Sequence, residues 1–335
     1  MSRRGGTGSV YQDDQDGYDR PARHTKPRTK DRPDYSKLDV ARVVTIDRGR
    51  YRCVIDGRAV SATKGRSLGR TSVIVGDLVR LDGDTTGEPG TLARIVEALE
   101  RRTVLRRTAD DDDPYERAIV ANADQLVIVT ALADPPPRMG MIDRILIAAY
   151  DAGIDPVLCL TKSDLEDPSE LIAAYEPLGV PIVVTRIGVE LSELRSYFDD
   201  HVSVLVGHSG VGKSTLVNAL IPSAHRATGV VNDVTGRGRH TSSAAIALEL
   251  PGGTGWVVDT PGVRSFGLSH VDPRNVLASF SDLAELSEDC PRGCTHAATE
   301  PECALDAAVA EGRLRPERLA SFRRIQVVDR SDRSN

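Results

Sequence analysis

One segment of the sequence combines the residue types and the spacing that a phosphate-binding loop requires. It matches the pattern G-x-x-x-x-G-K-[ST] and consists of Gly207, His208, Ser209, Gly210, Val211, Gly212, Lys213 and Ser214. In such loops backbone N–H groups surround the α- and β-phosphates, the lysine reaches the β- and γ-phosphates, and the serine hydroxyl binds Mg²⁺. We therefore predict a nucleotide site in which Lys213 is a catalytic residue and Ser214 is a Mg²⁺ ligand.

The sequence on both sides of this loop predicts the elements that must position it. The apolar run over residues 201–206 indicates a short buried strand, and residues 214–221 indicate a helix. This order directs the phosphates toward a helix N-terminus, where free backbone N–H groups favour anions. Thr215, in the first turn of that helix, is a further expected nucleotide contact.

A second segment with a chemical role is Asp259-Thr260-Pro261-Gly262, which follows a strand-like run over residues 255–258. An aspartate that leaves a strand beside the phosphate loop can hold Mg²⁺ through its water shell, and the Gly262 N–H can contact a γ-phosphate. We expect Asp259 to be a Mg²⁺ ligand and Gly262 to contact the nucleotide.

A third segment indicates which base is bound. Thr161, Lys162, Ser163 and Asp164 follow an apolar run over residues 156–160. The Asp164 carboxylate can accept hydrogen bonds from both N1 and N2 of guanine, whereas adenine offers no such donor pair, so the segment favours GTP over ATP. Thr161 stands where the common Asn-Lys-x-Asp pattern has asparagine. Thr185 and Arg186 follow another strand-like run. They occupy the place of the motif that contacts the guanine base from behind in GTP-binding proteins, the fifth of their sequence motifs.

Three of the five cysteines lie close together near the C-terminus. With one histidine they form the pattern C-x3-C-x-H-x6-C, whose members are Cys290, Cys294, His296 and Cys303. Three thiolates and one imidazole are a ligand set of closed, structural zinc sites, and a reducing cytoplasm disfavours disulfides. We predict one structural Zn²⁺ here. Cys53 and Cys159 lie in apolar strands and are expected to be inert core residues.

The order of these motifs resembles that of the bacterial ribosome small-subunit-dependent GTPases, a circularly permuted family also called the YjeQ or EngC type. The resemblance covers about residues 38–325, and in that family the guanine loop likewise precedes the phosphate loop. It implies GTP and GDP with Mg²⁺ as cofactors, and hydrolysis stimulated by the small ribosomal subunit during its late maturation. The family's zinc pattern has one more residue between the first two cysteines.

The resemblance also implies a first switch over residues 236–241, in which Thr241 binds Mg²⁺ in the GTP state. Thr235 competes with Thr241 for this role. The residue after Gly262 is Val263, which cannot orient a water molecule as the glutamine of small GTPases does. We therefore expect slow intrinsic hydrolysis, and we identify His240 as the candidate that positions the water.

The predicted fold class is a multi-domain α/β protein with an added β domain. Residues 1–36 are poor in apolar residues and are expected to form a disordered arm, and residues 37–107 show short strands separated by turns, as in an oligonucleotide-binding (OB-fold) barrel. Residues 108–272 alternate strands and helices, which predicts a P-loop GTPase domain with a doubly wound parallel sheet. Residues 273–328 should form a helical zinc-binding domain, followed by a tail over 329–335.

The charge is unevenly distributed, with a net +6 over residues 37–107 and −17 over residues 108–310. Basic flanks suit binding to the phosphate backbone of folded RNA, and the candidate contacts in the barrel are Arg42, Arg48, Arg50, Arg66 and Arg70. The alternative is ordinary solvated surface charge. The basic segment over residues 315–324 likewise allows two interpretations, an RNA contact or a surface helix that packs through Leu319 and Phe322.

No apolar run reaches the length of a membrane span, and the N-terminus is polar rather than a signal peptide. We expect a cytoplasmic, monomeric GTPase, away from any membrane, with the small ribosomal subunit and its rRNA as partners. Two alternatives stay open, an RNA-binding scaffold with a structural nucleotide and a metabolic or translational GTPase that acts on another RNA. Stimulation of GTP turnover by small subunits distinguishes the first reading from these two.

Overall fold

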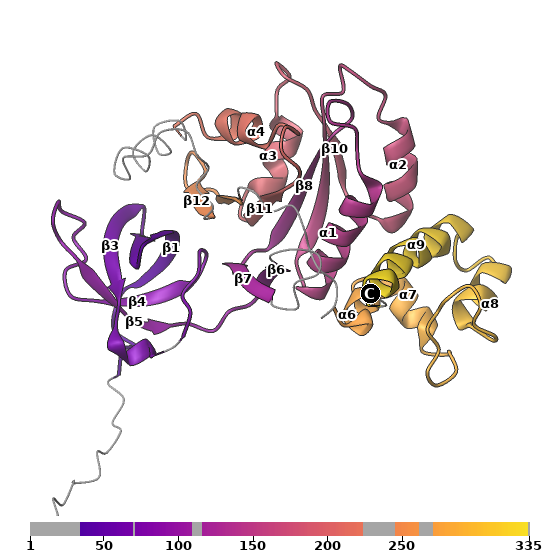
Figure 1. Ribbon diagram of the computed structural model, residues 1–335, viewed down its shortest axis with the longest axis horizontal. Coiled ribbons are helices and arrows are strands. Elements are labelled where there is room, and N and C mark those ends of the chain that lie inside the picture. The colour runs from indigo at the N-terminus through magenta and orange to yellow at the C-terminus, as the bar shows by residue number, and fades with distance from the viewer. Residues whose placement is uncertain (1–33, 70, 109–115, 224–244, 261–270, 334–335) are drawn as a thin grey trace, which may run out of the picture. The chain divides into compact units, whose positions relative to one another are not determined.

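The computed structural model describes residues 34–69, 71–108, 116–223, 245–260 and 271–333 (Figure 1). Nearly all of the arm expected over residues 1–36 lies outside these ranges. The same holds for the expected switch residues Thr235, His240, Thr241, Gly262 and Val263. In the part of the chain that is described, no helix is both long and apolar enough to cross a membrane.

The first folded region is a closed five-stranded barrel with strand order β1-β2-β3-β5-β4. Its strands are β1 (Val40–Asp47), β2 (Arg50–Ile55), β3 (Arg58–Lys64), β4 (Leu78–Asp82) and β5 (Ala93–Ala98), shown in indigo in Figure 1. All neighbours are antiparallel except β3 and β5. Residues at alternate positions along the strands, such as Tyr51 and Cys53, fill the interior, whereas Arg52 between them is exposed. The predicted barrel of five short strands is confirmed.

A two-stranded antiparallel sheet follows the barrel, formed by β6 (Val104–Thr108) and β7 (Glu116–Ala121). These strands were not predicted, because the acidic run between them indicated only a domain boundary. Leu105 and Val120, which are paired across the two strands, are fully buried. This burial explains why a segment with so many charged residues still forms strands.

The central sheet has six strands in the order β10-β9-β8-β11-β13-β12. They are β8 (Gln125–Ala131), β9 (Asp155–Thr161), β10 (Ile182–Val184), β11 (Val202–Val206), β12 (Ile246–Glu249) and β13 (Trp256–Asp259). The first five in that spatial order are parallel, whereas β12 is antiparallel to β13. The prediction of a parallel sheet is therefore wrong at this edge. A short turn through Gly252 and Gly253, both with positive φ, joins β12 to β13, and such a turn can only connect antiparallel strands.

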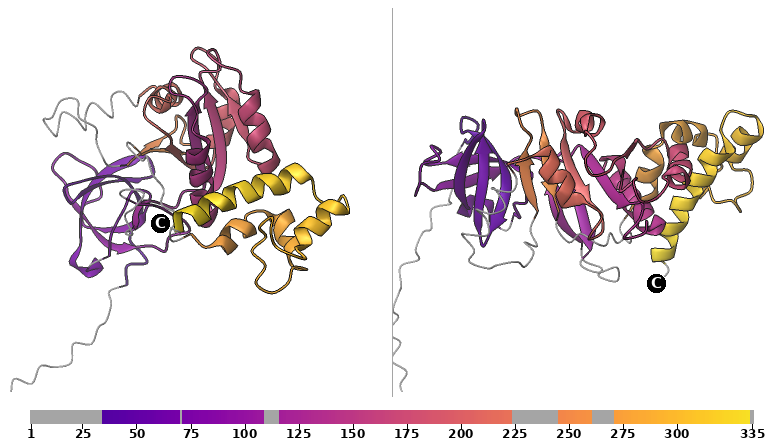
Figure 2. Two further views of the ribbon diagram at one scale, coloured as in Figure 1. Left: turned by 45° about the vertical axis from the view of Figure 1, so that its right-hand side comes forward. Right: turned by 90° about the horizontal axis from the view of Figure 1, so that it is seen from above.

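Helices cover both faces of this sheet (Figure 2). They are α1 (Met139–Asp151), α2 (Ser169–Tyr175) with the short η2 (Glu176–Leu178), α3 (Ser192–Phe198) and α4 (Lys213–Leu220). Alternate residues of one strand enter two different hydrophobic clusters. Ile128 of β8 packs in the cluster that contains α1, and its neighbour Val127 packs in the cluster that contains α3 and α4. The strands are thus buried on both sides, as a doubly wound sheet requires.

The C-terminal region is helical and comprises α6 (Pro273–Ala278), α7 (Ser281–Ser287), α8 (Ala304–Ala310) and α9 (Pro316–Arg333). α9, yellow in Figure 2, packs along α1, and Phe322 belongs to the same hydrophobic cluster as the α1 residue Ile145. Phe280 links the two helices, because its ring centroid lies 4.7 Å from that of Tyr150 and 5.4 Å from that of Phe322. Leu319 is buried as well, so the packing interpretation of this helix is correct for its apolar face.

Candidate functional site

The segment expected to bind phosphates connects the end of β11 to the start of α4. Gly210 and Gly212 have φ values of +83° and +101°, a backbone region that side-chain-bearing residues rarely adopt. Gly207 lies against β8 so closely that a Cβ atom there would overlap the carbonyl oxygen of Val129. The glycines of the pattern are therefore required by the path of the backbone, which turns in front of the N-terminus of α4.

Lys213 and Asp259 bring opposite charges to this loop. The ammonium group of Lys213 donates to the carbonyl oxygens of Gly207 and His208, the latter at 3.0 Å. Burial lowers the pKa of Lys213, and the charge of Asp259 opposes this shift. Burial likewise raises the pKa of Asp259, and Lys213 opposes that shift. A cation and a carboxylate that partly offset each other's burial are suited to a site for phosphate and a divalent cation.

The expected guanine loop begins at the end of β9 and contacts the phosphate loop directly. The buried hydroxyl of Thr161 lies 2.6 Å from the carbonyl oxygen of Val211 and 3.3 Å from that of Thr130. Lys162, with φ of +58°, donates from its ammonium group to the carbonyl oxygen of Asp134. Thr161, the one departure from the common pattern, thus joins the guanine loop, the phosphate loop and β8.

The remaining residues of the guanine loop lie beside β10. The backbone N–H of Ser163 donates to the carbonyl oxygen of Thr185 at 3.3 Å. Asp164 follows with an exposed side chain. Ser214 and Thr215 are also exposed at the start of α4. The structure therefore brings the two separate sequence motifs to one edge of the sheet, the carboxyl ends of its parallel strands, where α/β proteins bind ligands.

The four predicted metal ligands form one cluster. Their ligand atoms all lie within 4.8 Å of one another. Nδ1 of His296 is 3.6 Å from the sulfur of Cys290, 3.6 Å from that of Cys294 and 3.9 Å from that of Cys303. Zinc bonds of about 2.3 Å to sulfur and about 2.1 Å to nitrogen place such atoms about 3.6 Å apart in a tetrahedron. The donor set and its spacing therefore fit a tetrahedral metal ion.

The backbone around the cluster is arranged to support thiolates. The N–H of His296 donates to the sulfur of Cys294 at 3.4 Å, and the N–H of Ala304 donates to that of Cys290 at 3.3 Å. His296 has a φ of +56°, and Gly293, at +85°, closes the short turn between the first two cysteines. A histidine in this backbone region indicates a local constraint, as expected for a residue whose ring must reach a common centre.

Comparison with known proteins identifies the family of this chain. The family model described as RsgA GTPase matches residues 98–269. The Small ribosomal subunit biogenesis GTPase RsgA of Pseudomonas aeruginosa strain LESB58 is 44% identical over 240 residues, which cover 69% of each chain. The chain belongs to the RsgA GTPase family. The protein of the same name from Pseudomonas syringae pv. tomato strain DC3000 is 38% identical over 285 residues, covering 79% of this chain and 80% of that protein.

Solved structures agree with this membership in the RsgA family. The crystal structure of YjeQ from Thermotoga maritima matches with a TM-score of 0.64 and 26% identity, over 87% of this chain and 97% of that chain. The crystal structure of YloQ, described as a circularly permuted GTPase, matches with a TM-score of 0.64 at 23% identity, over 89% and 97%. The chain is therefore a GTP hydrolase with the circularly permuted fold that the motif order predicted.

One residue of this RsgA-family chain has an unusual environment at the expected base site. The side-chain hydroxyl of Thr185 is buried and has no hydrogen-bond partner among the described residues. A buried hydroxyl without a partner costs about 1–3 kcal/mol. Because Thr185 directly follows β10 and its carbonyl oxygen holds Ser163, this hydroxyl is available to a group that enters beside the guanine loop.

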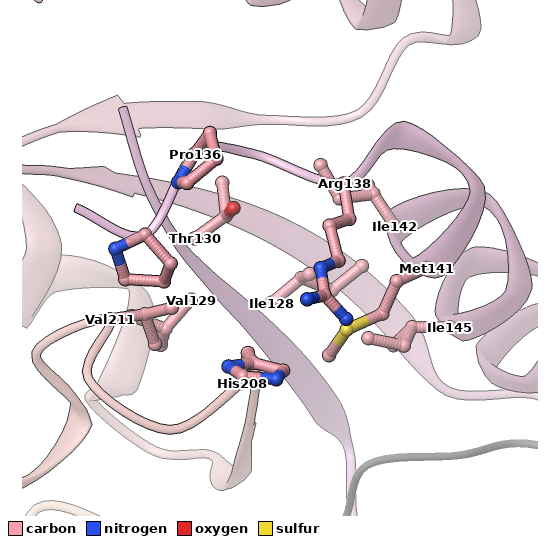
Figure 3. A pocket seen from close by; sticks show the side chains of 12 residues that line it. Ile128, Val129, Thr130, Pro136, Arg138, Met141, Ile142, Ile145, His208 and Val211 are labelled. Carbon is pink, nitrogen blue, oxygen red and sulfur yellow. The ribbon is translucent and has the colours of Figure 1, made fainter. Parts of the chain in front are cut away.

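A small pocket lies beside the phosphate loop (Figure 3). It has room for about one water molecule, about 20 Å³, and it is bounded by β8, α1 and the loop. The residues that line it are Ile128, Val129, Thr130, Pro135, Pro136, Arg138, Met141, Ile142, Ile145, Gly207, His208 and Val211. Gly207, His208 and Val211 of the phosphate loop belong to this lining, whereas Lys213 and Asp164 do not, so the pocket adjoins the expected nucleotide surface at the loop alone. Residues 135–138 were not predicted to be neighbours of the loop, because they are distant from it in the chain.

Proposed function

We propose that this chain binds GTP and GDP with Mg²⁺ and uses GTP hydrolysis to act on the small ribosomal subunit during its late maturation. The observation that carries the proposal is the contact of Thr161 with Val211, which joins the guanine-type loop to the phosphate-type loop. The small ribosomal subunit is inferred as the partner from the relatives, which are named "Small ribosomal subunit biogenesis GTPase RsgA". The cytoplasm is the compartment in which such a function would be performed.

We infer separate roles for the residues of the nucleotide site. Lys213 neutralises charge on the β- and γ-phosphates, while Ser214 and Asp259 hold Mg²⁺ together with Thr241. Asp164 binds the guanine edge, and the unpartnered Thr185 hydroxyl supports a contact beside it. His240 is proposed to position the attacking water. Thr241 and His240 lie outside the described residues, and their roles are inferred from the sequence alone.

The barrel is proposed as the main RNA contact. Six arginines in the described part of the barrel are exposed, namely Arg48, Arg50, Arg52, Arg58, Arg66 and Arg94. Arg42 is better explained by packing, because its guanidinium lies 5.6 Å from the ring centroid of Trp256 and its pKa is lowered chiefly by burial. Tyr51, the one aromatic residue between positions 37 and 107, is buried, so the exposed arginines favour contacts with an RNA backbone over base stacking, and binding should weaken steeply as salt concentration rises.

The metal of the cysteine cluster is proposed to be zinc with a structural role. Its four protein ligands leave no open position for a substrate in a tetrahedral site. When bound, the ion would cross-link the segment from Cys290 to His296 with the start of α8. Elemental analysis of purified protein tests this assignment, and one zinc per chain is the expected result.

Subunit-stimulated GTP turnover is the decisive experiment for the whole proposal. We expect slow hydrolysis by the protein alone and a large increase on addition of purified small subunits, but not of large subunits. Lys213→Ala should abolish both rates. Intact binding of a fluorescent GTP analogue without any stimulation by small subunits would reject the proposed action and favour the RNA-binding scaffold.

A further inference from the structure

Arg323, in the middle of α9, donates four hydrogen bonds. All four acceptors lie in the segment that carries the metal ligands, residues 290–303 (the metal loop), or directly after it. Its Nε donates to the carbonyl oxygen of His296 at 2.8 Å, and Nη2 lies 3.5 Å from the carbonyl oxygen of Ala297. Nη1 and Nη2 donate to the two carboxylate oxygens of Asp306 at 2.9 and 2.7 Å. One guanidinium thus binds a metal ligand's own peptide group and a carboxylate at the same time.

The two partners of Arg323 belong to the two halves of the ligand set. His296 follows Cys294 in the first half, and Asp306 lies in the first turn of α8, three residues after Cys303. The planar fork of an arginine fixes the direction of each bond that it donates, which a lysine does not. Arg323 therefore sets the distance between the two halves of the cluster independently of any ion.

The geometry of Arg323 favours these bonds. Its side chain is 17% exposed and that of Asp306 is 47% exposed, so the guanidinium is shielded by the protein, and the bidentate arrangement fixes the direction of the pair even though the carboxylate is open to water. The same guanidinium constrains His296, whose φ of +56° is an unfavourable backbone conformation for histidine. A hydrogen bond to its carbonyl oxygen opposes relaxation of this peptide to a more common conformation.

We propose that Arg323 is a positioning residue of the metal centre, which holds His296 and the start of α8 in the geometry that the ion requires. This inference rests on the proposed zinc site. Groups that orient metal ligands typically change metal affinity about 10–100-fold when they are removed. Arg323 acts through His296 and Asp306 and does not itself bind the metal.

The position of α9 does not depend on Arg323. The next residue, Arg324, faces α1 and lies 3.3 Å from the Asp143 carboxylate, while Phe322 is fully buried in the shared hydrophobic cluster. Arg318, one and a half turns earlier, donates to Asp282 and to the carbonyl oxygen of Pro177. These contacts keep the helix in place when Arg323 is changed, so the effect of a substitution should be confined to the metal loop.

The test compares zinc release from the full-length protein and two variants. Arg323→Met keeps the aliphatic stem and removes all four bonds. Arg313→Met is the matched control, because Arg313 also pairs with a carboxylate of the same region, Glu311, and its side chain has no hydrogen bond or ion pair to residues 290–303 among the described residues. With a chromogenic chelator, we expect zinc release about 10–100-fold faster from Arg323→Met and unchanged from Arg313→Met.

Two further measurements separate a positioning role from a general loss of structure. Urea unfolding at saturating zinc should give Arg323→Met the same transition for the central sheet as the unchanged protein. Arg323→Lys should release zinc at an intermediate rate, because an ammonium group can keep one of the two partners. If Arg323→Met does not fold, Asp306→Asn removes the charge of the pair and should accelerate release several-fold.

The outcomes distinguish this inference from the proposed zinc site. The positioning role is overturned if Arg323→Met releases zinc at the rate of the unchanged protein. If Arg323→Met does not fold, the same result with Asp306→Asn overturns it. A purified chain that holds no stoichiometric zinc overturns the metal site itself.

Discussion

The nucleotide loops and the metal loop hold their binding groups in two different ways. The phosphate loop is formed by backbone geometry, through glycines with positive φ and the close approach of Gly207 to Val129, on strands that are buried on both faces. In the metal loop only Cys303 among the four ligands is fully buried, and the loop is held by side-chain bonds from α9. The first site is therefore built by the sheet before any ligand binds, whereas we propose that the second depends on its ion and on Arg323.

Metal removal should separate the two regions most strongly. Structural zinc contributes on the order of 10 kcal/mol to the folding of small metal-binding segments. On chelation we expect amides of residues 288–303 and α8 to lose hydrogen-exchange protection, while β8, β9 and β11 keep theirs. Hydrogen exchange followed by mass spectrometry measures this directly. Equal loss of protection in the sheet would show that the two regions unfold as one unit and that the comparison is wrong.

The ion pair between α1 and α9, which connects the two regions, should give the next largest effect on stability. Asp143 of α1 is 4% exposed in its side chain and pairs with Arg324, whose guanidinium also lies 4.8 Å from the ring centroid of Tyr175. Arg324→Met leaves a buried carboxylate without its cation, which costs about 3–5 kcal/mol. Urea unfolding at pH 8 should show this loss, and Arg324→Met with Asp143→Asn should recover most of it.

The pH dependence of that loss has a definite sign. Burial raises the pKa of Asp143 in the folded protein, and Arg324 opposes the increase. Without Arg324 the folded-state pKa rises further, so the folded state binds a proton more tightly than the unfolded state does. Stability then falls as pH rises from the unfolded pKa of about 4 toward the folded pKa. The deficit of Arg324→Met should therefore be smaller at pH 5 than at pH 8, and an equal deficit at both would contradict the buried-charge explanation.

The arginines of α9 also show where sequence reasoning reached its limit. The basic segment over residues 315–324 indicated a helix, and packing through Leu319 and Phe322 was one of the two interpretations that stayed open. The partners of Arg318, Arg323 and Arg324 were not predictable, because Asp143 and Pro177 are far away in the sequence. Ion pairs between distant elements leave no local pattern, so the same charges were equally compatible with an RNA contact.

Local patterns were sufficient where the backbone itself imposes a residue type. Alternating apolar residues predicted the barrel strands, and glycine spacing predicted a loop that the structure forms between β11 and α4. The cysteine and histidine spacing predicted four ligand atoms that do converge. The direction of β12 and the β6–β7 pair were missed, since both depend on which neighbour a strand finds rather than on its own sequence.

A glycine substitution tests whether the phosphate loop is formed by its backbone. In Gly207→Ala the new Cβ would overlap the carbonyl oxygen of Val129, so either the loop or β8 must move. We expect GDP affinity to fall at least about 100-fold, equivalent to about 3 kcal/mol, with zinc content unchanged. Gly140→Ala in α1 is the control, because a Cβ there meets nothing within 4 Å. A fluorescent GDP titration measures both, and equal affinities would show that the loop adapts easily.

Substitutions at Thr161 should give the smallest effect on GDP affinity. They test whether a side-chain hydrogen bond also contributes to the nucleotide site, as side-chain bonds do in the metal loop. Thr161→Val keeps the shape of the side chain but leaves the carbonyl oxygen of Val211 without the donor at 2.6 Å. An unpaired buried acceptor costs about 1–3 kcal/mol, which predicts GDP binding about 5- to 150-fold weaker. Thr161→Ser retains the hydroxyl and should bind almost normally, whereas zinc release should be unaffected in both. If serine and valine weaken binding equally, shape rather than the hydrogen bond couples the two loops. Equal and normal binding by both would mean that the sheet alone fixes the nucleotide site, and that the side-chain bond between the loops is dispensable.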